Sequence, residues 1–215
     1  MKILAVDTAL GACSAALLGG GSVLARLFVA MERGHAEALA PMVEAVMREA
    51  DIGFSAVDRL AVTVGPGTFT GQRVGLAFMR ALRVALNRPL TGVTSLAAIA
   101  EQARAETGAD HAAVIHDARR SEVYLEIDDG GARLARFEDV SSALRGVTGT
   151  LVLAGTAASR MAEILEAEGR TFLLSKITAP DAQWVARLAA KSEPQESAPR
   201  PLYLRAPDAK LPARP

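Results

Sequence analysis

Short apolar runs separated by turn residues predict a meander of three strands at the start of the chain. Residues 3–6 are apolar and end at Asp7, which is typical of a buried strand with polar side chains at its end. Residues 13–18 and 23–31 are two further strand candidates, and Gly19-Gly20-Gly21 between them tolerates the positive φ of a tight turn. We therefore expect three strands before the first helix.

Helical and strand patterns then alternate. The expected elements are a helix over 35–50, a strand over 60–64, a loop over 65–70, a helix over 71–87, a short strand that closes at Val93 and a helix over 95–107. Asp51-Ile52-Gly53 ends the first helix, Pro89 stops the second, and Ser95 is predicted to cap the third. These elements predict α/β crossovers that follow the initial meander.

The same order of elements repeats beyond Gly108. Strands are expected over 112–116, 122–127, 133–137 and 151–154, and helices over 141–145 and 157–167, with a hairpin turn from Asp128 to Gly131. Two successive β-β-β-α-β-α units predict a duplicated α/β fold with a cleft between its halves. We place the N-terminal lobe at 1–108 and the C-terminal lobe at 109–191.

Prolines concentrate at the end of the chain. Six of the ten lie at or beyond Pro194, and proline at that density prevents a regular element. Residues 192–215 are therefore expected to form an extended Pro-rich tail, pinned by Leu202-Tyr203-Leu204.

Composition limits the possible functions. Half of the 215 residues are hydrophobic, and Lys plus Arg and Asp plus Glu both total 24, without the basic excess expected of a protein that binds nucleic acid unaided. The single Cys13 excludes an internal disulfide, and no Cys/His cluster is spaced like a zinc site. The apolar run at 3–6 is too short for a signal peptide or for the roughly 20 residues that span a bilayer. We expect a cytoplasmic protein without membrane association.

A glycine-rich loop, Gly65-Pro66-Gly67-Thr68-Phe69-Thr70-Gly71, lies between a predicted strand and a predicted helix. A turn in this place can present backbone N–H groups to an anion at the helix N-terminus. Its glycine spacing matches neither the Walker pattern nor the dinucleotide-binding pattern. From these residues alone, a phosphate site and a structural tight turn are both open.

The longer string from Gly65 to Gly75, GPGTFTGQRVG, resembles the signature of the bacterial TsaB (YeaZ) family, and the resemblance covers nearly the entire chain. It extends to Val6-Asp7-Thr8-Ala9, to Gly34-His35-Ala36-Glu37 with Leu39 and Pro41, to Asp117-Ala118-Arg119-Arg120 with Glu122-Val123-Tyr124, and to Pro201-Leu202-Tyr203-Leu204-Arg205. Two positions depart from the family pattern. Gln72 stands where an aliphatic residue is common and Met79 where a smaller residue is common, so their effect on the packing of helix 71–87 is not predicted.

The resemblance implies a two-lobed, actin-like ATPase fold (ASKHA, ribonuclease H-like), in agreement with the duplicated order of elements. It implies a non-catalytic dimerisation and scaffold subunit that supports the catalytic subunit TsaD. With the ATPase TsaE, that complex transfers a threonylcarbamoyl group to the adenosine beside the anticodon of tRNA. The chain then contacts tRNA indirectly, forms a homodimer when alone, has no intrinsic cofactor, and meets ATP only at an interface of the complex.

Actin-like kinases hold phosphate with a carboxylate and a flexible turn in each lobe. The positions that correspond here are Asp7, Thr8, Gly65, Gly67, Thr68 and Asp117. The first turn keeps only part of the pattern, and Arg119 and Arg120 stand where glycines would let a phosphate approach. We interpret these residues as a degenerate phosphate site, in which Asp7 caps backbone N–H groups and Asp117 is a turn residue.

No catalytic or metal-binding residue is predicted. His35, His111 and His116 lack the i, i+4 spacing that puts two imidazoles on one helix face. Two enzyme classes stay as alternatives: an actin-like small-molecule kinase, which needs Gly-rich phosphate turns in both halves, and a glycoprotease-like metallohydrolase, which needs a metal pair. A basic patch that recruits tRNA is a third alternative. Its residues would be Arg119, Arg120, Arg133 and Arg136, offset by Glu122, Glu126, Asp128 and Asp129.

The two first-lobe helices carry the strongest indication of a partner. The helix over 71–87 is apolar almost all round, so it must be buried on more than one side. The helix over 35–50 adds methionines, which suit a partner surface and a core equally. With the family resemblance, we expect contacts to TsaD or to a second copy through His35, Leu39, Met42, Val43, Val46, Met47, Val74, Phe78 and Leu82.

Overall fold

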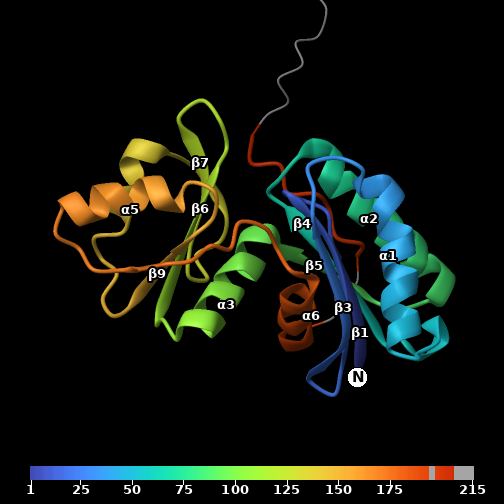
Figure 1. Ribbon diagram of the computed structural model, residues 1–215. Helices are drawn as coiled ribbons and strands as arrows, with labels where there is room; N and C mark the ends of the chain where they lie inside the picture. The colour runs from blue at the N-terminus through green and yellow to red at the C-terminus, as the bar shows by residue number, and fades with distance from the viewer. Residues whose placement is uncertain (194–196, 206–215) are drawn as a thin grey trace, which may run out of the picture.

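The computed structural model describes residues 1–193 and 197–205 (Figure 1). The first half of the chain contains β1 (Lys2–Asp7), β2 (Ala12–Gly19), β3 (Ser22–Ala30), α1 (His35–Glu49), η1 (Phe54–Ala56), β4 (Arg59–Gly65), α2 (Phe69–Leu86), β5 (Leu90–Thr94) and α3 (Ser95–Thr107). The second half contains β6 (His111–Asp117), β7 (Glu122–Ile127), β8 (Arg133–Arg136), η2 (Phe137–Asp139), α4 (Val140–Ala143), β9 (Leu151–Ala154), α5 (Ala158–Ala167), β10 (Leu173–Leu174) and α6 (Ala182–Lys191).

These elements build two five-stranded sheets with one topology. The strand orders are β3-β2-β1-β4-β5 and β10-β9-β6-β7-β8. β1 pairs antiparallel with β2 and parallel with β4, and β6 pairs in the same way with β7 and β9. The predicted repetition of three strands followed by α/β crossovers is therefore confirmed.

Local sequence signals explain where several elements begin and turn. Gly20 and Gly21 have positive φ in the turn between β2 and β3, where a side chain would strain the backbone. The Thr68 hydroxyl caps α2 by accepting the Gly71 N–H. The cap of α3 is Thr94, which accepts the Ala97 N–H, and the predicted cap Ser95 is already the first helical residue.

Helices form layers on both faces of each sheet (Figure 1). α1 and α2 pack on one face of the first sheet around a core that includes Leu4, Leu17, Val46 and Met79. α6 packs on the opposite face, against β1 and β2. α3 packs on the second sheet against β6 and β9 and also contacts α6, while α5 covers the far face of that sheet. The layer of α3 and α6 therefore joins the two lobes.

The connections fix the directions of α1 and α2. β4 is parallel to β1 and to β5, and β3 is antiparallel to β2 and so runs with β1. α1 connects β3 to β4 and α2 connects β4 to β5, so both helices return against these strands. α1 and α2 consequently run side by side in the same direction, with both N-termini at the edge where β4 ends.

Helix α6 and strand β10 were not among the predicted elements. α6 falls inside the range 109–191, yet it lies on the first sheet, because its apolar side covers the face of that sheet that α1 and α2 leave open. Part of the expected Pro-rich tail, residues 194–196 and 206–215, lies outside the described residues. None of the helices in the described ranges combines the length and the hydrophobicity needed to cross a bilayer.

Candidate functional site

The glycine-rich loop packs directly on the turn between β1 and β2. The Thr68 N–H donates to the Ala9 carbonyl at 2.8 Å. The Thr8 hydroxyl donates to the Gly71 carbonyl at 2.7 Å and accepts the Gly75 N–H at 3.0 Å. The Thr68 and Gly75 amides are thus used inside the lobe, and the Thr68 amide in particular is not offered to an anion.

Two glycines of the loop are required by this close approach. A Cβ atom on Gly67 would lie 2.2 Å from the Ala9 carbonyl oxygen, and one on Gly71 would lie 2.1 Å from the Thr8 carbonyl oxygen. Real Cβ contacts essentially never fall below 3.0 Å. Gly65 has φ 107° and faces the side chain of Gln72. The glycines of this loop therefore serve backbone packing between β1, β4 and α2.

Gln72 and Met79, the two departures from the family pattern, both point into the lobe. Met79 is fully buried in the core below α2. Gln72 is 2% exposed, and its Oε1 atom has no hydrogen-bond partner among the described residues. A buried carbonyl oxygen without a partner costs free energy, so Gln72 is a local defect in the packing of α2.

Asp7, at the end of β1, is completely buried. Its Oδ1 atom accepts the Thr63 hydroxyl at 2.5 Å and the Ala9 N–H at 3.1 Å, as expected for a capping carboxylate. Its Oδ2 atom has no partner among the described residues. Burial raises the pKa of Asp7 to about 7, and the nearby Asp181 carboxylate adds to the rise.

Asp117 ends β6, at the place in the second sheet that matches Asp7 in the first. Its N–H donates to the Thr156 hydroxyl, and its Oδ1 atom accepts the Arg119 N–H, both at 2.9 Å, so it is the turn residue that we predicted. Arg119, Arg120 and Ser121 then have φ of 65°, 56° and 61°. This turn therefore keeps a left-handed backbone that favours glycine, without the glycines that would make room for a phosphate.

Apolar residues lie at the junction of the two lobes, where the duplicated order of elements predicted a cleft. Ala9 and Leu10, on the turn after β1, are buried in a cluster with Leu96 of α3 and Val114 of β6. The five predicted positions Asp7, Thr8, Gly65, Gly67 and Thr68 do come together, but around backbone contacts within the first lobe. No group of three His, Cys, Asp or Glu side chains in the described ranges is arranged to hold a metal ion.

Two other titratable groups of the second lobe are largely shielded from water. Glu126 of β7 accepts the Thr94 hydroxyl at 3.2 Å, and burial raises its pKa to about 7. Burial lowers the pKa of His116 to about 4. Both shifts follow mainly from the loss of water around a charged group.

The predicted partner contacts on α1 need correction. Leu39, Met42, Val43, Val46 and Met47 all lie in the core of their own lobe, between α1 and the first sheet. A helix that packs on a sheet buries the apolar side chains that recur with the helical period. The apolar pattern of α1 therefore identifies the side that faces its own sheet and not a partner surface. His35 is also buried, with Nε2 3.2 Å from the Leu10 carbonyl oxygen.

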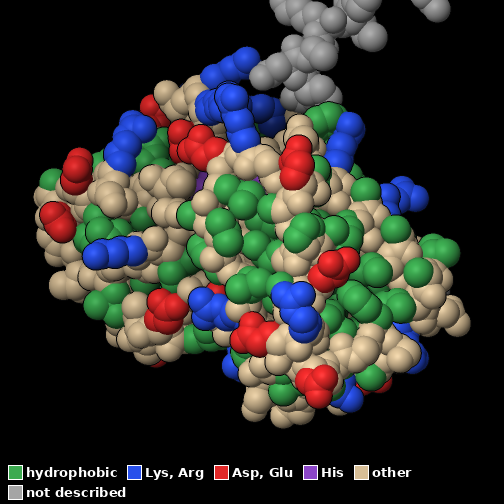
Figure 2. Space-filling view, turned by 45° about the vertical axis from the view of Figure 1, so that its right-hand side comes forward, with side chains coloured by type: hydrophobic (Ala, Val, Ile, Leu, Met, Phe, Trp, Pro, Cys, Tyr) green, Lys and Arg blue, Asp and Glu red, His purple; other side chains and the backbone are tan. Residues whose placement is uncertain are grey.

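The outward side of α2 is unusually apolar. Val74, Phe78 and Leu82 are half-buried at the edge of the core, and Ala77, Ala81 and Ala85 are exposed beside them. Phe69 is 50% exposed and Val84 is 80% exposed. In Figure 2, where the side that carries α1 and α2 is turned forward, hydrophobic side chains gather on this part of the surface. We call the outward sides of α1 and α2 the docking face.

The described part of the tail adds an aromatic side chain to the docking face. Tyr203 stacks on Phe69, with ring centroids 5.5 Å apart, and its hydroxyl accepts the Arg73 Nε–H at 3.0 Å. The Arg73 guanidinium lies 3.5 Å from the centroid of the Phe69 ring. We call these three residues the aromatic knob. All three residues lie in segments that carry the family resemblance, 65–75 and 201–205, but only the structure shows that they are in contact.

The tail is held to both lobes. The Leu202 N–H donates to the Val64 carbonyl at 2.7 Å, and Arg80 donates to the Pro199 carbonyl. Arg205 pairs with Glu122 and donates to the Ala118 carbonyl in the second lobe. The expected pinning near Leu202 and Tyr203 is therefore confirmed for residues 197–205.

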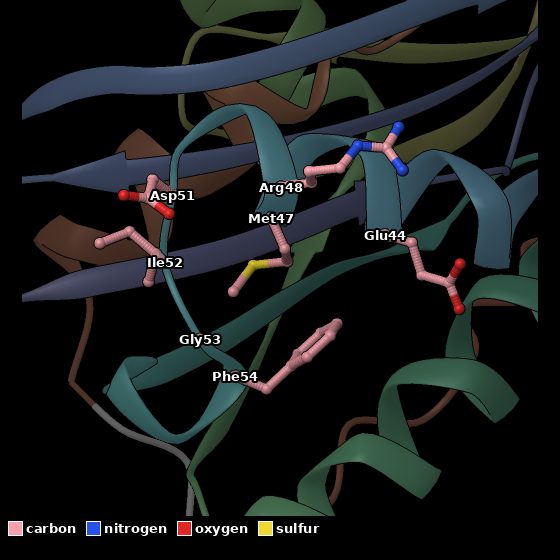
Figure 3. Close-up of a pocket in the computed structure, with 7 residues that line it drawn as sticks. All are labelled: Glu44, Met47, Arg48, Asp51, Ile52, Gly53 and Phe54. Carbon is pink, nitrogen blue, oxygen red and sulfur yellow. The ribbon is translucent and has the colours of Figure 1, made fainter.

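An open pocket of about 350 Å³ lies at the C-terminal end of α1. Its lining residues are Glu44, Met47, Arg48, Asp51, Ile52, Gly53 and Phe54. Figure 3 shows Met47 and Phe54 directed into the same space, with Glu44 and Arg48 on the helix above them. This α1-end pocket combines an apolar floor with two carboxylates and one guanidinium.

Comparisons with known proteins agree with this architecture. The sequence model of the family described as "TsaD: tRNA N6-adenosine threonylcarbamoyltransferase" matches residues 29–175. The tRNA threonylcarbamoyladenosine biosynthesis protein TsaB of Escherichia coli is 37% identical over 124 residues, which cover 58% of this chain and 53% of that protein. The match thus spans about half the length of this curated relative.

Solved structures extend the similarity over the whole fold. A Pseudomonas aeruginosa protein described as similar to peptidase YEAZ has a TM-score of 0.83 and 33% identity, over 95% of this chain and 99% of that one. Component A of the (R)-2-hydroxyglutaryl-CoA dehydratase of Acidaminococcus fermentans has a TM-score of 0.54 at 12% identity, over 89% of this chain and 98% of that one, a likeness of fold alone. The expected two-lobed, actin-like ATPase fold is confirmed.

Proposed function

Because the chain belongs to the TsaB/YeaZ branch of the TsaD family, we propose that it is an accessory subunit in tRNA threonylcarbamoyladenosine biosynthesis. In this role it supports the catalytic subunit TsaD as a non-catalytic scaffold and binds that subunit through the docking face. TsaE, ATP and tRNA join the complex through its other subunits, and ATP binds only at a subunit junction.

The observation that carries this proposal is the contrast between two surfaces. The predicted degenerate phosphate site is closed by backbone packing, with the Thr68 N–H bound to the Ala9 carbonyl and with Leu10 buried at the lobe junction. The docking face instead exposes Val84, Phe69 and a row of alanines. Contiguous exposed apolar surface is typical of a protein interaction site. A scaffold role follows more directly from this distribution than catalysis does.

Reconstitution tests this function. The purified chain is assayed alone and with TsaD, TsaE, ATP, threonylcarbamoyl-adenylate and tRNA, with modified adenosine as the readout. We expect no product from the chain alone and a clear stimulation when it is added to TsaD. Turnover by the chain alone would overturn the scaffold role, and absence of stimulation would remove the proposed function.

A charged substitution localises the contact. Val84 is 80% exposed, so Val84→Glu should leave the fold intact while placing a charge in the docking face. A buried unpaired charge at a protein interface costs several kcal/mol, so we expect TsaD binding to weaken at least about 100-fold. Ile164→Glu on α5, at a position 37% exposed, is the matched control and should bind as the wild type does.

A further inference from the structure

We propose that Arg205 is a positioning residue for the docking face, because it ties the tail, and with it the aromatic knob, to the second lobe. The inference deepens the proposed role of the docking face and rests on it. It gives a role to the tail residues 197–205, which join the end of β4 in the first lobe to the turn after β6 in the second.

The tail packs closely on the first lobe. Pro199 is buried, and its carbonyl accepts a hydrogen bond from Arg80 of α2 at 2.5 Å. A Cβ atom on Gly92 of β5 would lie 2.7 Å from the Cβ of Pro199, so glycine leaves the room that the tail needs at this point. The Leu202 N–H then donates to the Val64 carbonyl near the end of β4. These contacts hold the tail against the first lobe as far as Leu202.

Arg205 makes the contacts with the second lobe. Its guanidinium donates to the Ala118 carbonyl at 2.5 Å and to the Arg119 carbonyl at 3.3 Å. It also pairs with the Glu122 carboxylate. A planar guanidinium offers several donors in a fixed fork, which a lysine ammonium group cannot reproduce. One side chain of the tail therefore holds both ends of the turn between β6 and β7.

The turn that Arg205 holds has a strained backbone. Arg119, Arg120 and Ser121 all have left-handed φ, which costs free energy in residues that carry a side chain. Such a backbone persists only where the surrounding structure supports it, and it is common at clamps and switch regions. The donors of Arg205 supply part of that support. Loss of Arg205 therefore releases the turn as well as the tail.

The segment between the two attachment points is too short to absorb a displacement. Only two residues separate Leu202 from Arg205, and three residue steps span at most about 11 Å. Tyr203 is one of the two, and it stacks on Phe69 and accepts the Arg73 Nε–H. A shift of the turn between β6 and β7 is therefore passed to Tyr203, and through it to the first turns of α2.

The link acts in both directions. A coupling free energy between two sites is reciprocal. A partner that binds the docking face and holds the aromatic knob in place therefore strengthens the contact of Arg205 with the second lobe, and that contact strengthens binding of the partner. The affinity of the docking face thus depends on a turn of the second lobe that the partner need not touch.

Residue-resolved hydrogen exchange of the full chain alone tests the link without any partner. In Arg205→Gln, we expect the Leu202 amide and the Glu122 amide to exchange at least about 10-fold faster than in the wild type, because both attachment points loosen together. Arg145→Gln, which changes an exposed arginine of the second lobe, is the matched control and should leave both rates unchanged. Faster exchange at Glu122 alone would show a purely local role and would overturn the inference, as would no change at either amide.

Binding of TsaD tests the consequence for the docking face. Arg205→Gln and Tyr203→Ala should each raise the dissociation constant of TsaD about 5- to 20-fold, and Glu122→Gln should act in the same direction. In a Tyr203→Ala background, Arg205→Gln should add no more than about a 2-fold loss, because both changes break the same link. Where Val84→Glu weakens TsaD binding, an unchanged constant for Arg205→Gln or fully additive losses would overturn the inference.

The two proposals fail in different ways. If the exchange rates respond as expected while neither Val84→Glu nor Arg205→Gln affects TsaD, the tail link stands and the proposed contact with TsaD is wrong. If Val84→Glu weakens TsaD binding while Arg205→Gln leaves the exchange rates and the affinity unchanged, the docking face stands and the tail link is wrong.

Discussion

The substitution Gly71→Ala tests whether the glycine-rich loop exists for backbone packing. A new Cβ would lie 2.1 Å from the Thr8 carbonyl oxygen, which is fixed backbone and cannot rotate away. The start of α2 must therefore move from the turn after β1 by about 1 Å. That movement strains three hydrogen bonds: Thr68 to Ala9, Thr8 to Gly71, and Gly75 to Thr8.

The size of the effect follows from these contacts. Each hydrogen bond contributes about 1 kcal/mol net, so their loss costs about 3 kcal/mol. Overpacking adds about 1 to 3 kcal/mol, and the better helix propensity of alanine returns about 1 kcal/mol. We expect Gly71→Ala to lower the free energy of unfolding by about 3 to 5 kcal/mol. Without the contact to Thr8, the same change would stabilise the helix, so the sign itself is informative.

Urea unfolding followed by circular dichroism measures this difference. Gly11→Ala is the matched control, because Gly11 lies on the same turn after β1 and a Cβ there would meet nothing within 4 Å. The control should stay within about 0.5 kcal/mol of the wild type. If Gly71→Ala were neutral or stabilising, the close packing of the loop on the turn would be wrong, and a phosphate-binding role for the loop would regain support.

Three further changes follow from the buried groups and the strained turn. The pKa of Asp7 is raised to about 7 in the folded state, so the free energy of unfolding of the wild type falls as pH rises from about 4 to about 7. Asp7→Asn should remove this fall, so that at pH 8 the variant gains about 4 kcal/mol relative to its difference from the wild type at pH 4, measured by urea titration. Parallel pH profiles of the two proteins would refute this expectation. Gln72→Met should raise the free energy of unfolding by about 1 to 2 kcal/mol, measured by chemical denaturation, because it removes the unpaired Oε1 atom. A lower denaturation midpoint than that of the wild type would mean that Oε1 has a hydrogen-bond partner in solution. Ser121→Gly should raise the melting temperature, because glycine relieves about 1 kcal/mol of strain at φ 61°, and a lower melting temperature would contradict the left-handed turn.

The sequence predicted most elements because their signals are local. Strands 3–6 and 60–64 and the helix at 95–107 match the observed elements closely, since apolar period and turn residues act within a few positions. The same argument explains the error on α1. Its apolar period led us to expect Leu39 and Met47 at a partner interface. A helical period shows only that one side of the helix is buried, and in the structure the sheet of its own lobe buries that side.

By itself, the sequence determined the two-lobed repeat, the family and the loss of glycines at Arg119 and Arg120. Only the tertiary structure decided that α6 packs on the first sheet and that Leu10 is buried at the lobe junction. It also decided that Tyr203 bonds to Arg73, which is 130 positions earlier in the sequence. The physical reason is that strand and helix patterns report the surroundings of each residue within a turn or two. Contacts between distant segments depend on which apolar surfaces are still uncovered once those elements have packed.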